Sequence, residues 1–218
     1  MTPGTLAGRR IVVSAGPTYE DIDPVRYLGN RSSGRMGFAI AAAAARLGAE
    51  TVLVAGPVQL PTPAGVDRID VRSAAQMHEA VLAALPADVY VGAAAVADWT
   101  PRTVAPRKLK KREGQDTLTL ELVRTADVLA DVAAHAHRPR VVVGFAAETD
   151  ALEANARAKL AGKAVDLVAA NRVGVPGSGF ASERNALTVI GHDFMRELGP
   201  AAKTELADTL LELIASRL

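Results

Sequence analysis

The sequence predicts an α/β fold in which helices cover both faces of a mainly parallel sheet. Three observations lead to this prediction. Short apolar runs alternate with helical segments along the whole chain, which is typical of parallel sheets buried on both faces. The first strand is followed by a glycine-containing loop and then by an alanine-rich helix. No internal repeat or low-complexity linker divides the 218 residues, so a single Rossmann-like domain spanning residues 1–218 is expected.

The elements follow one another in regular order. Val- and Ile-rich runs predict strands at Arg10–Ala15, Thr51–Ala55, Arg68–Val71, Val89–Ala95, Arg140–Phe145, Leu167–Ala170 and Ala186–Ile190. Helical spacing predicts helices at Met36–Leu47, Ala74–Leu85, Ala126–His135, Ala151–Lys163 and Ala201–Leu218. Gly48 is expected to end the first helix, and Ser73 is expected to cap the second.

Composition excludes several classes of protein. Lys and Arg number 25 against 24 Asp and Glu, so the balanced charge gives no general attraction to nucleic acid. The chain has no cysteine and only 4 histidines, which argues against disulfides, a thiol nucleophile or a His/Cys metal site. No apolar run approaches the roughly 20 residues of a membrane span. We therefore expect a cytoplasmic protein without nucleic-acid or membrane partners.

The stretch from Asn30 to Gly37 is the most informative segment. Ser32, Ser33 and Gly34 precede the first helix, so backbone N–H groups and the positive end of the helix dipole meet there. Such a turn binds phosphate, and α/β folds place nucleotides or phosphorylated substrates at this position. Arg26 is suited to a phosphate or carboxylate, and Asn30 to a carbonyl or carboxyl oxygen. The alternative is an ordinary loop with a turn at Asp23-Pro24.

A second candidate site ends the strand at Val89–Ala95. Gly92, Ala93 and Ala94 are small enough to let a base or ribose approach the backbone. Asp98 could then accept a hydrogen bond from a ribose hydroxyl or an exocyclic amine. The alternative is a strand of small residues packed tightly under a helix.

The segment from Asp98 to Gln115 interrupts the alternation. It carries Lys108-Leu109-Lys110-Lys111, and the strictly alternating run Thr117–Val123 that follows it predicts a half-buried strand. We interpret residues 98–123 as an excursion from the sheet, a flap whose lysines could close over a polyphosphate. An ordinary surface loop with solvated charges is the alternative.

Two further candidates have structural alternatives, which from pattern alone are favoured for the lysine pair and equally supported for Phe145. Lys159 and Lys163 share one helix face, as do many pairs of merely exposed lysines. Phe145 could stack on a base or simply belong to the core. The chain lacks G-x-G-x-x-G, a Walker A sequence, G-x-S-x-G and H-E-x-x-H, so the usual dinucleotide, P-loop, esterase and zinc-protease sites are not supported.

Taken in order, the motifs resemble a known family. They are Ser14-Ala15-Gly16-Pro17-Thr18, Asp23-Pro24-Val25-Arg26-Tyr27, Asn30-Arg31-Ser32-Ser33-Gly34-Arg35-Met36-Gly37, Ala94-Ala95-Val96-Ala97-Asp98-Trp99, Lys108-Leu109-Lys110-Lys111, Gly144-Phe145-Ala146-Ala147-Glu148-Thr149 and Ala169-Ala170-Asn171. Each motif is weak alone, but the ordered set is similar to phosphopantothenoylcysteine synthetase, the phosphopantothenate–cysteine ligase of coenzyme A biosynthesis. The likeness runs from about Gly8 to the C-terminus.

The resemblance implies an activity and its participants. Members of the bacterial type join 4′-phosphopantothenate to L-cysteine, using CTP with a divalent metal, normally Mg²⁺, through an acyl-cytidylate that releases pyrophosphate and then CMP. The family's bacterial members often carry a flavin-dependent phosphopantothenoylcysteine decarboxylase in front of this domain. Family members form homodimers, and we expect Thr117–Val123 to form the pairing edge. The residues themselves do not rank CTP against ATP, nor do they identify metal ligands or the cysteine site.

The resemblance also assigns roles to residues. Asn30 matches the asparagine that handles the acyl-nucleotide, Arg26 a substrate-contacting arginine, and Lys108 the catalytic lysine, which also contacts the nucleotide. The remaining nucleotide contacts are matched by Gly92, Ala93, Ala94, Asp98, Ala126, Asp127, Val128, Leu129, Phe145, Lys159 and Lys163. Ala126 stands where the family often has proline, a mild departure that leaves backbone contacts possible.

Two other classes of function remain open at this stage. One is an NAD(P)-dependent reductase on a Rossmann-like sheet, which the missing glycine fingerprint disfavours and a failure to bind NAD(P)H would remove. The other is a non-catalytic nucleotide sensor, which would bind CTP without releasing pyrophosphate when phosphopantothenate is added.

Overall fold

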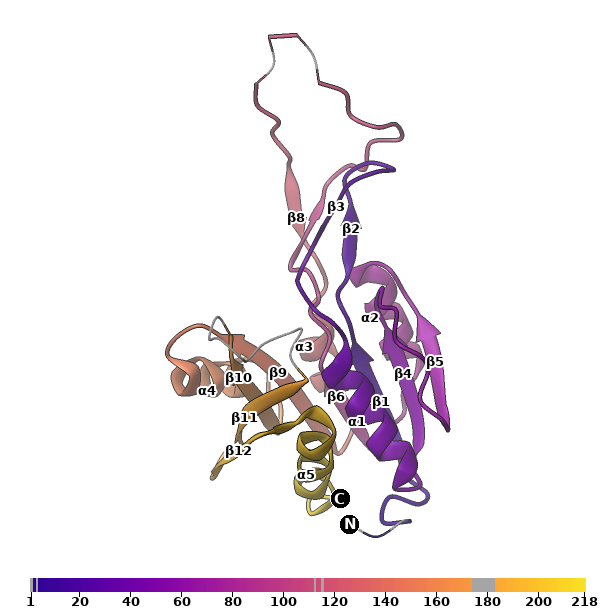
Figure 1. Ribbon diagram of the computed structural model, residues 1–218, viewed down its shortest axis with the longest axis vertical. Coiled ribbons are helices and arrows are strands. Elements are labelled where there is room, and N and C mark those ends of the chain that lie inside the picture. The colour runs from indigo at the N-terminus through magenta and orange to yellow at the C-terminus, as the bar shows by residue number, and fades with distance from the viewer. Residues whose placement is uncertain (1, 3, 112, 115, 174–182) are drawn as a thin grey trace.

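A computed structural model describes the chain at residues 2, 4–111, 113–114, 116–173 and 183–218. Its centre is an eight-stranded sheet in the order β12-β11-β10-β9-β6-β1-β4-β5 (Figure 1). The parallel strands are β1 (Arg10–Ala15), β4 (Glu50–Ala55), β5 (Val66–Asp70), β6 (Val89–Gly92), β9 (Val141–Glu148) and β10 (Leu167–Arg172). Two antiparallel strands, β11 (Arg184–Ile190) and β12 (Met195–Ala202), complete one edge. The mainly parallel sheet expected from the sequence is confirmed.

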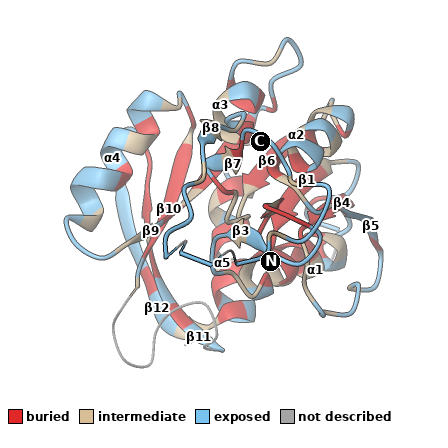
Figure 2. Ribbon diagram, turned by 90° about the horizontal axis from the view of Figure 1, so that it is seen from above, coloured by how far each residue is buried: buried red, intermediate tan, exposed pale blue. Residues whose placement is uncertain are grey.

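Helices cover both faces of this sheet. One face packs against α1 (Arg35–Arg46) and α5 (Lys203–Ala215), and the other against α2 (Ala74–Ala83), α3 (Val128–Ala133) and α4 (Leu152–Gly162). Figure 2 shows the buried strands between the two helical layers. The Val-, Ile- and Ala-rich runs form strands because both of their faces are removed from water here. Among the described residues, no helix is long and apolar enough to cross a membrane.

Most element boundaries agree with the sequence prediction to within a few residues. Ser73 caps α2 in a reciprocal capping box with Gln76, and Gly48 follows α1 with φ +93°, as expected. The strand at Val89–Ala95 is shorter than predicted, because β6 ends at Gly92. The long helix expected from Ala201 begins instead at Lys203, and the residues before it form β12, which was not predicted. In β12 only Leu198 is buried, so this edge strand has too weak an apolar pattern to be recognised from sequence.

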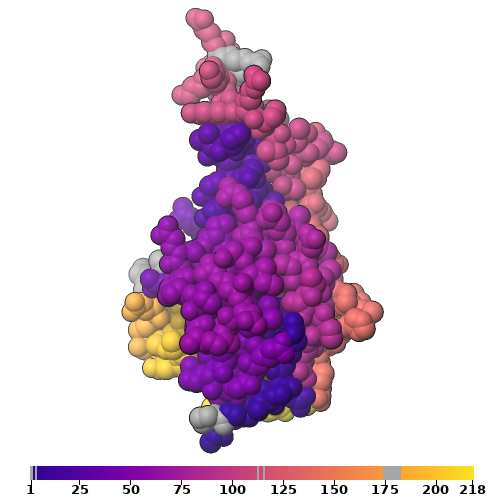
Figure 3. Space-filling model, turned by 90° about the vertical axis from the view of Figure 1, so that its right-hand side faces the viewer, coloured from indigo at the N-terminus to yellow at the C-terminus, as the bar shows by residue number. Residues whose placement is uncertain are grey.

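A second substructure, here called the arm, projects from the carboxyl edge of the sheet (Figures 1 and 3). The arm consists of residues 19–29 and 99–124, excluding Arg112 and Gln115, which lie outside the described residues. It contains the antiparallel pairs β2 (Tyr19–Asp21) with β3 (Tyr27–Gly29) and β7 (Trp99–Pro101) with β8 (Leu122–Arg124).

The strand predicted at Thr117–Val123 is wrong over most of its length. Only its last two residues, Leu122 and Val123, belong to β8, where they pair with Pro101 and Thr100. Residues 117–121 are irregular and run beside no strand in the described part of the chain. Alternation of apolar and polar residues allows a strand, but a strand also needs a hydrogen-bonding neighbour.

Candidate functional site

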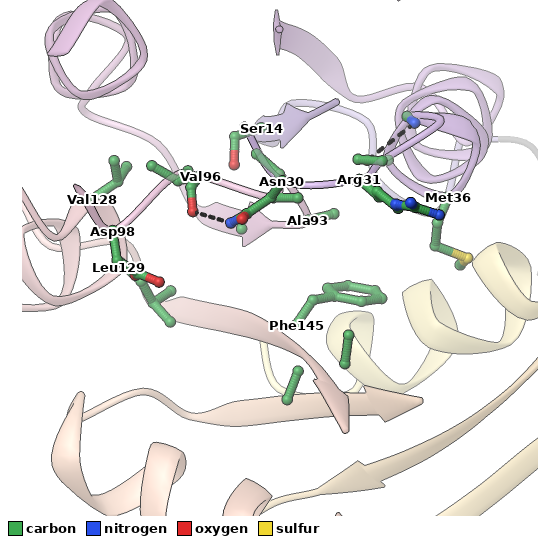
Figure 4. Close-up of a pocket in the computed structure, with 18 of the residues that line it drawn as sticks. Ser14, Asn30, Arg31, Met36, Ala93, Val96, Asp98, Val128, Leu129 and Phe145 are labelled. Carbon is green, nitrogen blue, oxygen red and sulfur yellow. Dashed lines mark hydrogen bonds between the residues drawn. The ribbon is translucent and has the colours of Figure 1, made fainter. Parts of the chain in front are cut away.

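A cavity of 980 Å³ opens at the carboxyl edge of the parallel strands (Figure 4). In open α/β sheets this edge is where ligands bind, and the volume lies in the range of sites for cofactors and substrates. The ends of β6, β9 and β10, the start of α1, and the helices α3 and α4 all contribute to its lining. The cavity therefore collects most of the candidate residues named from the sequence.

The start of α1 is built as the sequence predicts. Gly34 occupies the N-cap position in the left-handed region with φ +73°, and no side chain caps the helix. The backbone N–H of Gly34 donates to the Ser32 Oγ at 3.2 Å, which bends the loop inward. Gly37 lets the helix approach β1, because a Cβ there would lie 2.5 Å from the Ala15 Cβ. Ser32, Ser33 and Gly34 line the cavity, so a helix N-terminus faces it.

Asn30 is fixed across the cavity entrance. Its Nδ2 donates to the Val96 carbonyl oxygen at 2.8 Å, and Figure 4 shows the two residues joined in this way. The Thr18 Oγ1 accepts from the Ala97 N–H at 2.9 Å and ties the same segment to the loop after β1. The side-chain oxygen of Asn30 thus belongs to a positioned amide that can face a ligand.

The wall beyond β6 is made of small residues. Gly92, Ala93 and Ala94 line the cavity with Asp98, and Phe145 from β9 faces Ala93 and Asn30 across it (Figure 4). Phe145 is partly buried: it packs against the hydrophobic core and also lines the cavity, so part of it is accessible to a ligand. A flat group could lie between the ring and this backbone.

Below that wall the hydroxyls of Ser14 and Tyr90 share a hydrogen bond of 2.9 Å. Burial raises the pKa of Tyr90 to about 12, so its hydroxyl stays neutral and can donate.

Lysines from α4 supply positive charge at one end of the cavity. The Lys159 Nζ donates to the Phe145 carbonyl oxygen at 2.6 Å, and burial, followed by the nearby charge of Lys163, lowers the Lys159 pKa. Lys163 forms an ion pair with Asp127, which also caps α3 by accepting from the Ala130 N–H at 3.0 Å. Burial would raise the pKa of Asp127, but Lys163 and this cap together lower it. Ala126, Val128 and Leu129 line the cavity beside them.

Arg26 and Lys108 do not line this cavity. Arg26 lies on the arm, where its guanidinium pairs with Asp23 at 2.7 Å and also bonds the Leu109 carbonyl oxygen. The Asp23 carboxylate, which is fully buried, accepts the Leu109 N–H at 3.0 Å. Lys108, which directly precedes Leu109, is exposed. The basic segment is therefore anchored at its base to the turn between β2 and β3, away from the other site residues of this chain.

Sequence reasoning gave no role to several cavity residues, and three buried polar ones stand out among them. Asn171 lies one residue before the end of β10, Asn185 lies in β11, and Lys203 begins α5; all three line the cavity. Asn171 lies in a quoted motif without an assigned role. Asn185 and Lys203 follow segments whose spatial position depends on the antiparallel edge of the sheet, which the sequence pattern did not predict.

Within the described ranges no group of three or more His, Cys, Asp or Glu side chains could hold a metal ion. Mg²⁺ bound with nucleotide phosphates usually needs only one or two protein carboxylates. Asp98, Asp127 and Glu148 line the cavity and would satisfy that smaller requirement.

Together, the sheet topology and this cavity define an α/β protein with a large cavity at the carboxyl edge of its strands, the position where open α/β sheets bind ligands. The particular family is also clear: the chain belongs to the DNA/pantothenate metabolism flavoprotein C-terminal domain family, whose model matches residues 6–218.

Curated relatives are similar over almost the whole chain. The coenzyme A biosynthesis bifunctional protein CoaBC of Vibrio cholerae is 49% identical over 213 residues, which cover 97% of this chain and 53% of that protein. The CoaBC protein of Escherichia coli is 50% identical over 210 residues, covering 95% of this chain and 52% of that protein. This chain thus spans about half the length of the curated relatives it matches.

A solved structure, the C-terminal domain of CoaBC, superposes with a TM-score of 0.82 and 37% sequence identity, covering 98% of this chain and 97% of that one. The agreement in fold includes nearly all of both chains. The Rossmann-like α/β class expected from the sequence is therefore confirmed.

Proposed function

We propose that this chain is a phosphopantothenate–cysteine ligase of coenzyme A biosynthesis. The observation that carries the proposal is the single 980 Å³ cavity, which unites a helix N-terminus, a positioned asparagine amide and two lysines in a chain related to CoaBC proteins. A cavity of this size accommodates a nucleotide together with a second substrate. The reaction would join 4′-phosphopantothenate and L-cysteine, driven by CTP.

The proposed chemistry requires hydrogen-bond donors and cations in the site, and it does not require a nucleophile from the protein. A carboxylate is a poor acyl donor, because it is anionic and its oxygen is a poor leaving group. Its oxygen would therefore attack the α-phosphorus of CTP, forming an acyl-cytidylate and releasing pyrophosphate. The amine of cysteine would then attack the acyl carbon and expel CMP, leaving an amide. Both steps develop negative charge on oxygen, and preorganised N–H groups and cations stabilise such charge. No covalent enzyme intermediate is required.

Residue roles follow from position in the cavity. In this proposal Lys159, Lys163 and the N-terminus of α3 would hold the triphosphate, and the small-residue wall at Gly92–Ala94 with Phe145 would hold the nucleoside; all of them line the cavity. Asn30, held by Val96, would orient the acyl phosphate. Mg²⁺ accompanying CTP would offset phosphate charge, and the carboxylate of Asp98, which lines the cavity, would be one of its ligands.

Arg26 and Lys108 are assigned to this reaction by family resemblance, although they lie on the arm. The arm bears six exposed large apolar side chains: Val25, Tyr27, Trp99, Val104, Leu118 and Leu122. Such a concentration is typical of a protein interface. We also propose that two copies of the chain form a homodimer through their arms.

The proposal extends to a second partner and a location. A flavin-dependent phosphopantothenoylcysteine decarboxylase is proposed as a partner, since the curated relatives are bifunctional and about twice as long as this chain. The cytoplasmic location expected from composition remains a prediction.

Pyrophosphate release measured with CTP or ATP, with and without phosphopantothenate, tests the function. Release that requires the acid and is completed to CMP and amide by cysteine is the expected result. CTP binding without release would instead favour a nucleotide sensor, and binding of NAD(P)H would favour a reductase.

With Asn30→Asp we expect mass spectrometry to find accumulated acyl-cytidylate. The added carboxylate would repel the acyl phosphate and block the step between the two half-reactions. Lys108→Gln should slow turnover strongly and leave the fold intact.

A further inference from the structure

Two hydroxyl groups, from Ser14 and Tyr90, lie at the floor of the cavity. The Ser14 Oγ near the end of β1 and the Tyr90 hydroxyl oxygen on β6 are 2.9 Å apart, and each residue is only 1% exposed. Both residues line the cavity, and Figure 4 shows the Ser14 hydroxyl pointing into it. The hydroxyl pair therefore lies where the buried sheet meets the space for a ligand.

This hydroxyl pair holds one proton more than its own hydrogen bond uses. Each hydroxyl carries one proton that it can donate, and the bond between the two oxygens uses one of the two protons. In the part of the chain that the structure describes, neither hydroxyl has a second hydrogen-bond partner. Buried donors are nearly always hydrogen-bonded, so the spare proton indicates an acceptor on a bound ligand.

The neighbours of the pair indicate which part of a nucleotide supplies that acceptor. A Cβ on Gly92 would lie 3.3 Å from the Tyr90 ring, so the ring lies directly behind the wall proposed for the nucleoside. Burial raises the Tyr90 pKa, and the negative charge of Asp127, at the N-cap of α3 beside the proposed triphosphate site, adds to that rise. The Ser14 hydroxyl points to the side of the cavity where Asn30 lies (Figure 4). The α-phosphate is the group that joins the nucleoside to the rest of the triphosphate, and it would lie between these neighbours.

We propose that the Ser14 hydroxyl donates a hydrogen bond to a non-bridging oxygen of the nucleotide α-phosphate and is a catalytic residue of the first half-reaction. This inference rests on the proposed function, in which a carboxylate oxygen attacks the α-phosphorus of CTP. The bond from that oxygen to phosphorus forms while the bond from phosphorus to the pyrophosphate oxygen breaks, and its electron pair leaves with pyrophosphate. Both hydroxyls keep their protons, and the donor stabilises charge on the non-bridging oxygen in the transition state.

Tyr90 is a positioning residue in this arrangement. Burial raises its pKa to about 12, so the phenol keeps its proton at neutral pH. A phenol is a more acidic donor than an alcohol, so the Tyr90 O–H donates to the Ser14 Oγ and leaves the Ser14 proton for the ligand. A hydroxyl that accepts a hydrogen bond is polarised and becomes a stronger donor itself. Tyr90 therefore orients and strengthens the Ser14 donor without contacting the phosphate.

Steady-state pyrophosphate release with the two diastereomers of cytidine 5′-O-(1-thiotriphosphate) tests the proposal. Each diastereomer replaces one of the two non-bridging α-oxygens by sulfur, which is a weaker acceptor. Ser14→Ala should lower kcat about 100-fold for the diastereomer that keeps the contacted oxygen, and less than about threefold for the other. Tyr90→Phe should show the same preference at about tenfold. The double variant should be no slower than Ser14→Ala alone, because Tyr90 acts through Ser14.

Thr51→Val is the matched control for loss of a buried hydroxyl. Thr51 is 2% exposed, its Oγ1 donates to the Ala49 carbonyl oxygen at 3.2 Å, and it does not line the cavity. This variant should leave the ratio of the two diastereomers unchanged. If Ser14→Ala slows both diastereomers equally or slows neither, the proposal is overturned, because a merely structural hydroxyl has no preference between the two oxygens. Tyr90→Phe decides by the same comparison if Ser14→Ala does not fold.

Calorimetric binding separates failure of this inference from failure of the ligase proposal. If the wild-type chain releases no pyrophosphate with CTP, phosphopantothenate and cysteine, the ligase proposal fails. Binding of CMP and of cytidine, which lacks the phosphate, then decides the role of Ser14. Ser14→Ala should weaken CMP binding about fivefold or more and leave cytidine binding unchanged. Equal weakening of both ligands, which would assign the hydroxyl to the ribose or base, or unchanged CMP binding would refute the inference.

Discussion

The sheet body and the arm are held together in different ways. In the body, apolar side chains on both faces of the strands are buried under five helices within one chain (Figure 2). On the arm, six of the eight large apolar side chains that the described residues leave exposed are gathered on two short strand pairs and their connections. The body therefore obtains its stability from burial, while the arm needs other interactions to keep its shape.

Polar and aromatic contacts supply those interactions. Glu20, only 4% exposed, accepts the first N–H of α2 from Ala74 at 2.8 Å and thereby joins the arm to the body. Tyr19 stacks on Tyr27 with ring centroids 3.9 Å apart, and the Arg72 guanidinium lies over both rings. The orientation of the arm therefore depends on a few directional contacts. Single substitutions there should change the arm's orientation more than the free energy of unfolding of the whole chain.

The largest expected effect is a loss of free energy of unfolding, and it should follow substitutions in the body but not in the arm. Leu210 is fully buried between α5 and the sheet, so Leu210→Ala should lower the free energy of unfolding by about 2–5 kcal/mol. Leu122→Ala on the arm, at 37% exposure, should change it by no more than about 0.5 kcal/mol. Urea unfolding followed by circular dichroism measures both. Equal losses would show that the arm is part of the cooperative core.

The next effect concerns assembly and should be confined to the arm. Trp99→Asp places a charge in the proposed dimer interface and should convert the homodimer to monomer with little change in unfolding. Ile69→Asp, on the edge strand β5, alters a similarly exposed apolar side chain of the body and serves as the matched control. Sedimentation velocity reads out the mass of each variant. Dissociation by Ile69→Asp instead would move the interface to the sheet edge.

Prediction from sequence succeeded in the sheet body and largely failed in the arm. Strands such as β1 and β4 were predicted almost residue by residue, because burial on both faces leaves a continuous apolar run. The arm was recognised only as an interruption: β2, β3 and β7 are three residues each, too short to show a period. The alternating pattern at Thr117–Val123 wrongly predicted a strand over its whole length, since residues 117–121 have no neighbouring strand among the described residues.

The site shows a similar pattern. Residues next to predicted strands or helices, such as Asn30, Asp98 and Lys159, lie at the cavity as expected. Lys203 was missed because β12, which no local pattern predicts, reverses the chain just before α5. Asn185 directly precedes the predicted strand Ala186–Ile190, but no motif marks it as a cavity residue. Arg26 and Lys108 are cations suited to a phosphate or carboxylate, but the structure places them on the arm. Their positions in the sequence did not predict that they would lie outside the cavity.

A smaller, local effect should follow loss of the arm's buried carboxylate. Burial would raise the pKa of Asp23, but the N–H groups of Leu109, Val25 and Arg26 and the Arg26 side chain outweigh it and lower the pKa to about 2. Asp23→Asn removes that charge, so the segment around Leu109 should detach and trypsin should cleave faster after Lys108 and Lys110. Cleavage in the body, for example after Arg196, is the internal control.

The sign of the pH dependence at Asp23 follows from its lowered pKa. The hydrogen-bonded carboxylate is fully charged above the ordinary aspartate pKa, and its contribution is lost as the pH falls toward about 2. Detachment of the basic segment should therefore accompany acidification in the wild type, monitored by amide exchange at Leu109. An anchoring that weakens near neutral pH would contradict the role given to this carboxylate.

The smallest expected effect is a shift in a pH profile. Burial and the charge of Lys163 lower the pKa of Lys159, so affinity for CTP should fall with rising pH earlier than an ordinary lysine would allow. Lys159→Arg keeps its charge and should move that fall to higher pH, at some cost in affinity because the guanidinium fits the Phe145 carbonyl differently. Calorimetric titration with CTP from pH 7 to about 10 compares the two. Because Asp23 does not line the cavity, Asp23→Asn should leave the midpoint of this titration unchanged, and a shift in that variant would show that the arm and the body are coupled through the nucleotide site.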